Sequence, residues 1–98
     1  MKINRSAYDT GSTNWVTGTT DDGYWFEAEV HAEPSENGIK SERFEQGGNV
    51  TELHIRDARG RDVYSSGGGL CYGESVRHYA EAASEIVDAL ETEFCEVV

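Results

Sequence analysis

Apolar and polar residues alternate along much of this chain and then change to a helical period near its end. The clearest alternation runs from Tyr24 to Ala32, where an apolar set faces one way: Tyr24, Phe26, Ala28, Val30 and Ala32. The intervening residues face the other way: Trp25, Glu27, Glu29 and His31. A period of two residues is typical of a β-strand with one buried face. We therefore predict a strand here, with a tryptophan among carboxylates on its polar face.

Weaker signals predict further strands on both sides of this one. Residues 15–20 are β-prone, and Asp22-Gly23 is a hairpin signal. Beyond the Glu33–Gly38 loop we expect strands at 39–44, at 50–57 with Thr51, Leu53 and Ile55 inward, and at 62–65. Residues 1–13 are polar and mixed, which fits a flexible lead-in or a short edge strand. Residues 67–73 form a Gly-rich connection.

A helix is predicted over residues 74–96. At about 100° per residue, one arc is apolar: Val76, Tyr79, Ala80, Ala83, Ile86, Val87, Leu90 and Phe94. The opposite arc is acidic: Glu74, Glu81, Glu85 and Asp88. Glu91, Glu93 and Glu96 add negative charge at the negative end of the helix dipole, which is unfavourable. We expect Gly73 or Ser75 to cap the helix.

These elements define one α+β domain spanning residues 1–98, because a chain of 98 residues supports a single modest core. Consecutive strands joined by short turns predict a four- to five-stranded antiparallel meander over residues 14–66. The C-terminal helix should cover its apolar face, since both have an apolar side to bury.

The net charge of −11 is concentrated in two blocks. Residues 21–36 carry six carboxylates and no Lys or Arg, and residues 74–98 carry seven carboxylates against Arg77. Such a field repels nucleic acids and anionic membranes and speeds encounter with basic partners. Solubility or adaptation to high salt would explain the same acidity. Residues 1–13 contain no apolar signal-peptide core, so we expect a cytoplasmic protein in which Cys71 and Cys95 are free thiols.

Two motif fragments suggest chemistry but lack their decisive residues. Residues 68–75 have the spacing of a phosphate loop, yet Glu74 stands where that motif needs Lys. His31-Ala32-Glu33 matches half of a zinc deaminase signature without the P-C-x-x-C half. His31, His54 and His78 fall on separate elements. We predict no catalytic residue, no metal site and no cofactor, and leave a small enzyme as the least favoured alternative.

The carboxylates form two rows whose spacing resembles that of a nucleic-acid backbone. Glu81, Glu85 and Asp88 advance by about 6 and 4.5 Å along the helix axis. Glu27, Glu29 and Glu33 form a second row, spaced by roughly 6.6 Å where residues alternate in the strand. Phosphates on one DNA strand advance by about 3.4 Å. Two such rows would suit a groove lined by Lys and Arg, and Trp25 is a candidate anchor for a protein interface.

On these six carboxylates, its size and its sheet-plus-helix pattern, the chain resembles phage-encoded DNA mimics, including anti-CRISPR proteins. It is also similar to small uncharacterised phage and bacterial domains through Pro34-Ser35-Glu36-Asn37-Gly38-Ile39. The resemblance implies inhibition by occupying the nucleic-acid site of a basic protein or ribonucleoprotein complex. The alternative is a small accessory or structural module that forms a homodimer or binds a partner through an uncovered sheet edge or face.

Overall fold

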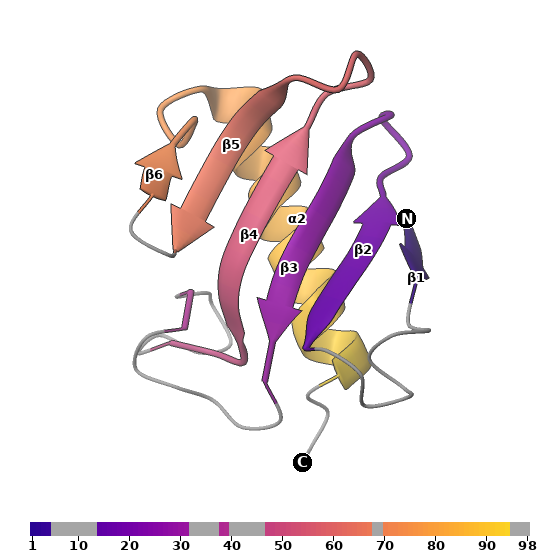
Figure 1. Cartoon of the computed structure of the whole chain (residues 1–98), viewed down its shortest axis with the longest axis vertical. Coiled ribbons are helices and arrows are strands. Elements are labelled where there is room, and N and C mark those ends of the chain that lie inside the picture. The colour runs from indigo at the N-terminus through magenta and orange to yellow at the C-terminus, as the bar shows by residue number, and fades with distance from the viewer. Residues whose placement is uncertain (5–13, 32–37, 40–46, 68–69, 95–98) are drawn as a thin grey trace.

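One antiparallel sheet and a helix across one of its faces make up the described part of the chain. The computed structural model describes residues 1–4, 14–31, 38–39, 47–67 and 70–94 (Figure 1). The strands lie in the sheet in chain order: β1 (Lys2–Asn4), β2 (Trp15–Thr19), β3 (Trp25–Val30), β4 (Val50–Arg56), β5 (Asp62–Gly67) and β6 (Leu70–Tyr72). Helix α2 (Arg77–Phe94) then crosses behind the sheet. The predicted α+β meander covered by a C-terminal helix is confirmed.

The sheet has six strands, two of which extend the predicted set of four or five. β1 lies within the segment expected to be a lead-in or an edge strand, and Ile3 pairs with Gly18. β6 lies within the predicted Gly-rich connection, where Cys71 pairs with Ser66. The strand predicted at 39–44 falls outside the described residues except for Ile39, whose N–H donates to the Val50 carbonyl at 2.7 Å.

The hairpins β2–β3 and β4–β5 turn through the same kind of loop. The Gly23 N–H donates to the Thr20 carbonyl at 3.1 Å, and the Gly60 N–H donates to the Asp57 carbonyl at 2.9 Å. Both glycines have positive φ, 90° and 82°, which residues with a side chain rarely adopt. The hairpin predicted at Asp22-Gly23 is therefore present.

The core lies between the sheet and α2. The strands contribute Val16, Phe26, Ala28, Val30, Val50, Leu53, Ile55 and Tyr64, and the helix contributes Ala82, Ala83, Ile86, Val87 and Leu90. Phe26, Ala28 and Val30 are the inward set of the predicted alternation. Val76 was expected in the apolar arc but is 37% exposed, because it precedes the helix.

A bulge at the start of β4 changes the predicted inward row. The register shifts between Glu29 and Val30, so that Glu29 pairs with Glu52 and Val30 pairs with Val50. Val50 is fully buried, whereas the Thr51 hydroxyl donates to Glu29 Oε1 at 2.9 Å. The prediction that Thr51 joins the inward row is wrong, because the extra residue of the bulge interrupts the alternation.

The helix begins at Arg77 rather than at residue 74. The Val76 N–H donates to the Gly73 carbonyl at 3.1 Å, which forms a turn before the helix. The Val76 carbonyl then accepts the first helical hydrogen bonds, from Tyr79 and Ala80. Neither Gly73 nor Ser75 is the cap. Gly73 instead has φ +87° and lies too close to the Val63 carbonyl to leave room for a side chain.

Glu91 joins the far end of α2 to the sheet. Its side chain is 1% exposed, and its Oε1 accepts the backbone N–H groups of Asn49 at 2.9 Å and Val50 at 3.3 Å. Gly48 has no room for a side chain beside this carboxylate. The sequence suggested an exposed charge at the negative end of the helix dipole. The fold buries the carboxylate and gives it backbone donors on β4.

We predict that Glu91→Ala lowers the free energy of unfolding by roughly 2–3 kcal/mol, since it leaves two buried N–H groups without an acceptor. Glu91→Gln should be close to neutral. Glu91 Oε2 and Asn49 Oδ1 are buried acceptors that have no hydrogen-bond partner among the described residues. The side-chain amide of Glu91→Gln replaces the Glu91 Oε2 acceptor with an N–H donor. Urea denaturation measures both variants. Equal losses in the two would contradict this account of the contact.

A second prediction concerns the turn at Asp57. Its Oδ1 accepts the N–H groups of Arg59 at 2.9 Å and Arg61 at 3.0 Å, and its Oδ2 accepts from Arg61 Nε at 2.9 Å. The backbone hydrogen bond from Arg61 is the main cause that lowers the pKa of Asp57. The ionised group therefore stabilises the fold above its unfolded pKa of about 3.9, and this contribution is lost as pH falls through the folded pKa.

We expect Asp57→Asn to lower the melting temperature at pH 7. The difference from the wild type should shrink as pH falls below about 4, where the unfolded state takes up a proton first, and should be smallest below the lowered folded pKa, where Asp57 is protonated in both states. Melting followed by circular dichroism between pH 7 and pH 3 tests this, with Asp88→Asn on the exposed helix face as the control. A difference that stays constant down to pH 3 would count against the hydrogen-bonded carboxylate.

Candidate functional site

Trp25 lies on the face of the sheet that α2 does not cover. It is 59% exposed, the largest exposed fraction among the big hydrophobic side chains of the described residues. Its neighbours across the sheet are Thr19 on β2 and Arg56 on β4. Because Phe26 points into the core, alternation directs Trp25 outward, as the sequence predicted.

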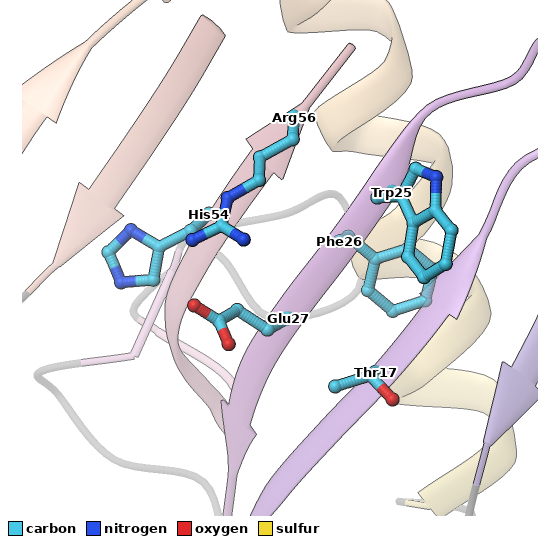
Figure 2. A pocket seen from close by; sticks show the side chains of 6 residues that line it. All are labelled: Thr17, Trp25, Phe26, Glu27, His54 and Arg56. Atoms are coloured by element: carbon cyan, nitrogen blue, oxygen red, sulfur yellow. The ribbon is translucent and has the colours of Figure 1, made fainter. Parts of the chain in front are cut away.

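An open depression of about 170 Å³ adjoins Trp25 on this face (Figure 2). Its lining residues come from β2, β3 and β4: Thr17, Trp25, Phe26, Glu27, His54 and Arg56. A second depression of about 160 Å³ continues toward β6 and shares Glu27, His54 and Arg56 with the first. Tyr72, which lines the second depression, is 41% exposed. The open face therefore presents aromatic rings together with charged groups.

Arg56 is the cation at the centre of this surface. Its Nε donates to Asp62 Oδ1 at 2.9 Å, and this hydrogen bond, together with the negative charges of Asp62 and Glu27, raises the pKa of Arg56. Both members of the Arg56–Asp62 pair are more than half exposed. Glu27 is exposed and makes no ion pair with any residue that the structure describes. One carboxylate of the predicted strand row is thus available beside Trp25.

Glu29 is less available than its place in the row suggested. It is partly buried, and its Oε1 accepts from the Thr51 hydroxyl at 2.9 Å and lies 3.2 Å from His31 Nε2. These contacts belong to the bulge between β3 and β4. Glu33 lies outside the described residues. Of the three carboxylates predicted for the strand row, Glu27 alone is described as exposed.

The helix row is more regular. Glu81, Glu85 and Asp88 are all exposed on the outer side of α2. Glu81 Oε1 accepts a hydrogen bond from Arg77 Nε at 2.8 Å, and the two residues form an ion pair one helical turn apart. Glu85 and Asp88 make no ion pair with any described residue. This row therefore has two uncompensated carboxylates on a helix whose other side is packed in the core.

The strand row and the helix row do not share a surface. Helix α2 lies behind the sheet (Figure 1). Phe26, Ala28 and Val30 are buried against it, so alternation directs Glu27 away from it, and the exposed acidic side of α2 is opposite its buried side. The molecule measures 23 Å along its shortest axis, which is the viewing direction of Figure 1. The structure brings Trp25 and Glu27 together. It places Glu81, Glu85 and Asp88 on the opposite side.

A hydrogen-bonded chain that sequence spacing did not reveal crosses the open face. His54 Nδ1 lies 2.9 Å from Ser65 Oγ, and His54 Nε2 lies 3.0 Å from Glu52 Oε2. The ring stacks on Trp15, with centroids 6.1 Å apart. A neutral ring that donates to Glu52 and accepts from Ser65 satisfies all three groups. Glu52 and His54 share a strand face at i and i+2, and this spacing was the one available signal.

The hydrogen-bonded residues Ser65, His54 and Glu52 follow the order of groups found in a serine–histidine–carboxylate triad. Ser65, however, is 3% exposed, and its strand lies between β4 and β6, whose ladders use the backbone N–H groups that an oxyanion would need. An incoming carbonyl group has little access to Ser65 Oγ. The network is better suited to tying β4 to β5 and fixing the floor of the depression.

The segment with phosphate-loop spacing forms strand β6 where it is described. The Sγ–H of Cys71, within β6, donates to Glu74 Oε2 in the turn that follows the strand, at 3.1 Å. Cys71 is a free, exposed thiol, while Cys95 lies outside the described residues. Within the described ranges, no three His, Cys, Asp or Glu side chains gather closely enough to hold a metal ion.

No protein-family model, curated protein or solved structure matches this chain. Among the residues that the structure describes, no helix has both the length and the apolar character needed to cross a bilayer. Any functional conclusion therefore depends on the two surfaces themselves.

The Cys71–Glu74 contact makes a prediction about thiol reactivity. The hydrogen bond to Glu74 is the main cause that raises the pKa of Cys71, so less of the reactive thiolate is present at neutral pH. Glu74→Gln removes the carboxylate charge, and we expect faster alkylation of Cys71 by iodoacetamide at pH 7.5, read by mass spectrometry of the Cys71 peptide. Glu85→Gln, with the same change in net charge on α2, should leave the rate unchanged. An unchanged rate in Glu74→Gln would contradict the contact.

Proposed function

We propose that this protein is a non-enzymatic, phage-type inhibitor that binds a basic nucleic-acid-handling protein or ribonucleoprotein complex in the host cytoplasm. Like an anti-CRISPR protein that mimics DNA, it would block the nucleic-acid site by presenting carboxylates in place of phosphates. The observation that carries this proposal is the helix row. Glu85 and Asp88 are exposed and unpaired within the described residues, on a helix anchored by its buried face.

Rigidity matters because a charge mimic must hold its carboxylates in place. Ile86, Val87 and Leu90 are buried beneath the row, and Glu91 joins the end of the helix to β4. Carboxylates on a rigid helix can accept paired hydrogen bonds from arginine, as phosphates do, and the packed helix fixes the backbone positions from which they project. The net charge of −11 adds long-range attraction toward a basic partner.

The second candidate is a small accessory module that binds a partner, or a second copy of itself, through the open face of the sheet. Its specific support is the exposure of Trp25 and Tyr72 on a face that no described element covers. Exposed aromatic residues in a shallow depression are typical anchors of protein interfaces. In this case the acidity of the helix would serve solubility.

Charge reversal on the helix distinguishes the two candidates. We expect Glu85→Lys combined with Asp88→Lys to abolish capture of the basic partner by the immobilised protein from host lysate. Capture by the wild type should weaken steeply as salt rises and should be lost on adding duplex DNA, because the two would compete for one site. Captured proteins are identified by mass spectrometry.

The matched control is Asp21→Lys combined with Asp22→Lys, which makes the same change in net charge at the β2–β3 turn. If both double variants lose capture equally, net charge and not the helix row is responsible. Capture that survives high salt, duplex DNA and both double variants would refute mimicry and favour the accessory module.

A further inference from the structure

The depression beside Trp25 has the chemistry of a binding site for a single cationic side chain, and we call it the Trp25 site. We propose that it binds an arginine of a positively charged segment on a partner protein, with the guanidinium stacked on Trp25 and paired with Glu27. The proposal rests on the proposed function in one respect, that the partner is basic. It adds a second contact surface, on the side of the molecule opposite the helix row.

The indole ring of Trp25 is exposed on the open face. It is 59% exposed beside Thr17 in the depression, and so offers an uncovered π face. Cations are attracted to the face of an aromatic ring, and tryptophan is the strongest of the three aromatic types. Arginine suits this position better than lysine because its planar guanidinium stacks on the ring while its edge stays free to donate hydrogen bonds.

The carboxylate of Glu27 is the anionic partner for the guanidinium. Trp25 and Glu27 project from the same side of β3, two residues apart, a separation of about 6.6–6.8 Å along the strand (Figure 2). Figure 2 shows the Glu27 carboxylate turned toward Arg56 and His54, so a rotation of the Glu27 side chain brings it to a guanidinium stacked on Trp25. Glu27 has no ion pair with any described residue, so an incoming guanidinium need not break an existing one.

This face already holds one guanidinium. Arg56 lines the same depression, donates a hydrogen bond to Asp62 and is acted on by the negative charge of Glu27. The surface therefore accommodates an arginine next to carboxylates. Arg56 also repels a second cation, and this gives a diagnostic sign. Removing Arg56 should tighten binding of a cationic ligand, whereas it should weaken binding of an anionic one.

The charge balance of the face selects against other occupants. Among the described residues, the open side of β3, β4 and β5 carries the carboxylates of Glu27, Glu29, Glu52 and Asp62, and the charges of Asp62 and Glu27 act on Arg56. A polynucleotide strand stacking on Trp25 would bring its phosphates toward these carboxylates, and the molecule as a whole repels it. A basic protein segment meets no such barrier.

The test uses the whole protein and two probes, the acetylated and amidated peptide Gly-Arg-Gly-Arg-Gly-Arg and its lysine counterpart. Binding is measured at low ionic strength by calorimetry and by the NMR shift of the Trp25 indole N–H. We expect the arginine peptide to bind more tightly than the lysine peptide and to shift the Trp25 signal. Trp25→Ala should weaken binding of the arginine peptide by roughly fivefold or more.

Two matched variants distinguish binding at the Trp25 site from general attraction of the peptide to an acidic protein. Glu27→Gln and Glu85→Gln change the net charge equally, and we expect Glu27→Gln to weaken peptide binding several times more. Arg56→Gln should strengthen it. If Trp25→Ala and Glu27→Gln have no more effect than Glu85→Gln, or if Arg56→Gln weakens binding, the proposal is wrong.

Failure here and failure of the proposed function give different results. If Glu85→Lys with Asp88→Lys abolishes capture of a basic partner while Trp25→Ala leaves peptide binding intact, the proposed function is supported and the Trp25 site is refuted. If capture is insensitive to salt and to charge reversal while Trp25→Ala and Arg56→Gln behave as expected, the Trp25 site is supported and charge mimicry by the helix is refuted. Trp25→Phe, which keeps an aromatic face, should retain part of the affinity that Trp25→Ala loses.

Discussion

The buried carboxylate of Glu91 is the contact on which the arrangement of the two surfaces depends. It accepts backbone N–H groups from Asn49 and Val50, which lie more than forty residues earlier in the chain. The contact fixes the end of α2 against the start of β4, next to the bulge. Because α2 cannot turn about its axis without losing these hydrogen bonds, the same contact decides which side of the helix faces solvent. Together with the buried apolar side of α2, it keeps the positions of Glu85 and Asp88 directed outward.

The main features of the fold could be predicted from periodicity, because periodicity reports which face of an element is buried. The alternation in β3 and the helical period around Ile86 and Leu90 correctly identified the two surfaces that pack together. The features that were not predicted depend on contacts between distant residues. The role of Glu91 requires donors on β4, the outward turn of Thr51 requires the register of β3 against β4, and β6 forms only because β5 offers it an edge. No local pattern encodes these partners.

The candidate site was predictable to a similar extent. Alternation placed Trp25 and Glu27 on the polar face of β3, where the structure has them. If the helix covers Phe26 and Ala28, the outer side of the helix and the outer side of the strand must face opposite directions. A single groove that takes both acidic rows does not follow from a two-layer fold. The link between His54 and Ser65 was not accessible, since it depends on the pairing of β4 with β5.

The two surfaces differ in how far their charges act. On the sheet, Arg56 compensates part of the negative charge through its ion pair with Asp62, so recognition there depends on short-range contact with Trp25 and Glu27. On the helix, Arg77 pairs with Glu81 and leaves Glu85 and Asp88 uncompensated, so attraction from that side begins at longer range. The screening length is about 8 Å at physiological ionic strength, and the molecule measures 23 Å along the axis that separates the two faces. A partner bound at one face therefore scarcely senses the carboxylates of the other. Since one groove cannot contact both, a target that uses the two surfaces together must wrap around an edge of the sheet or supply two separate basic elements.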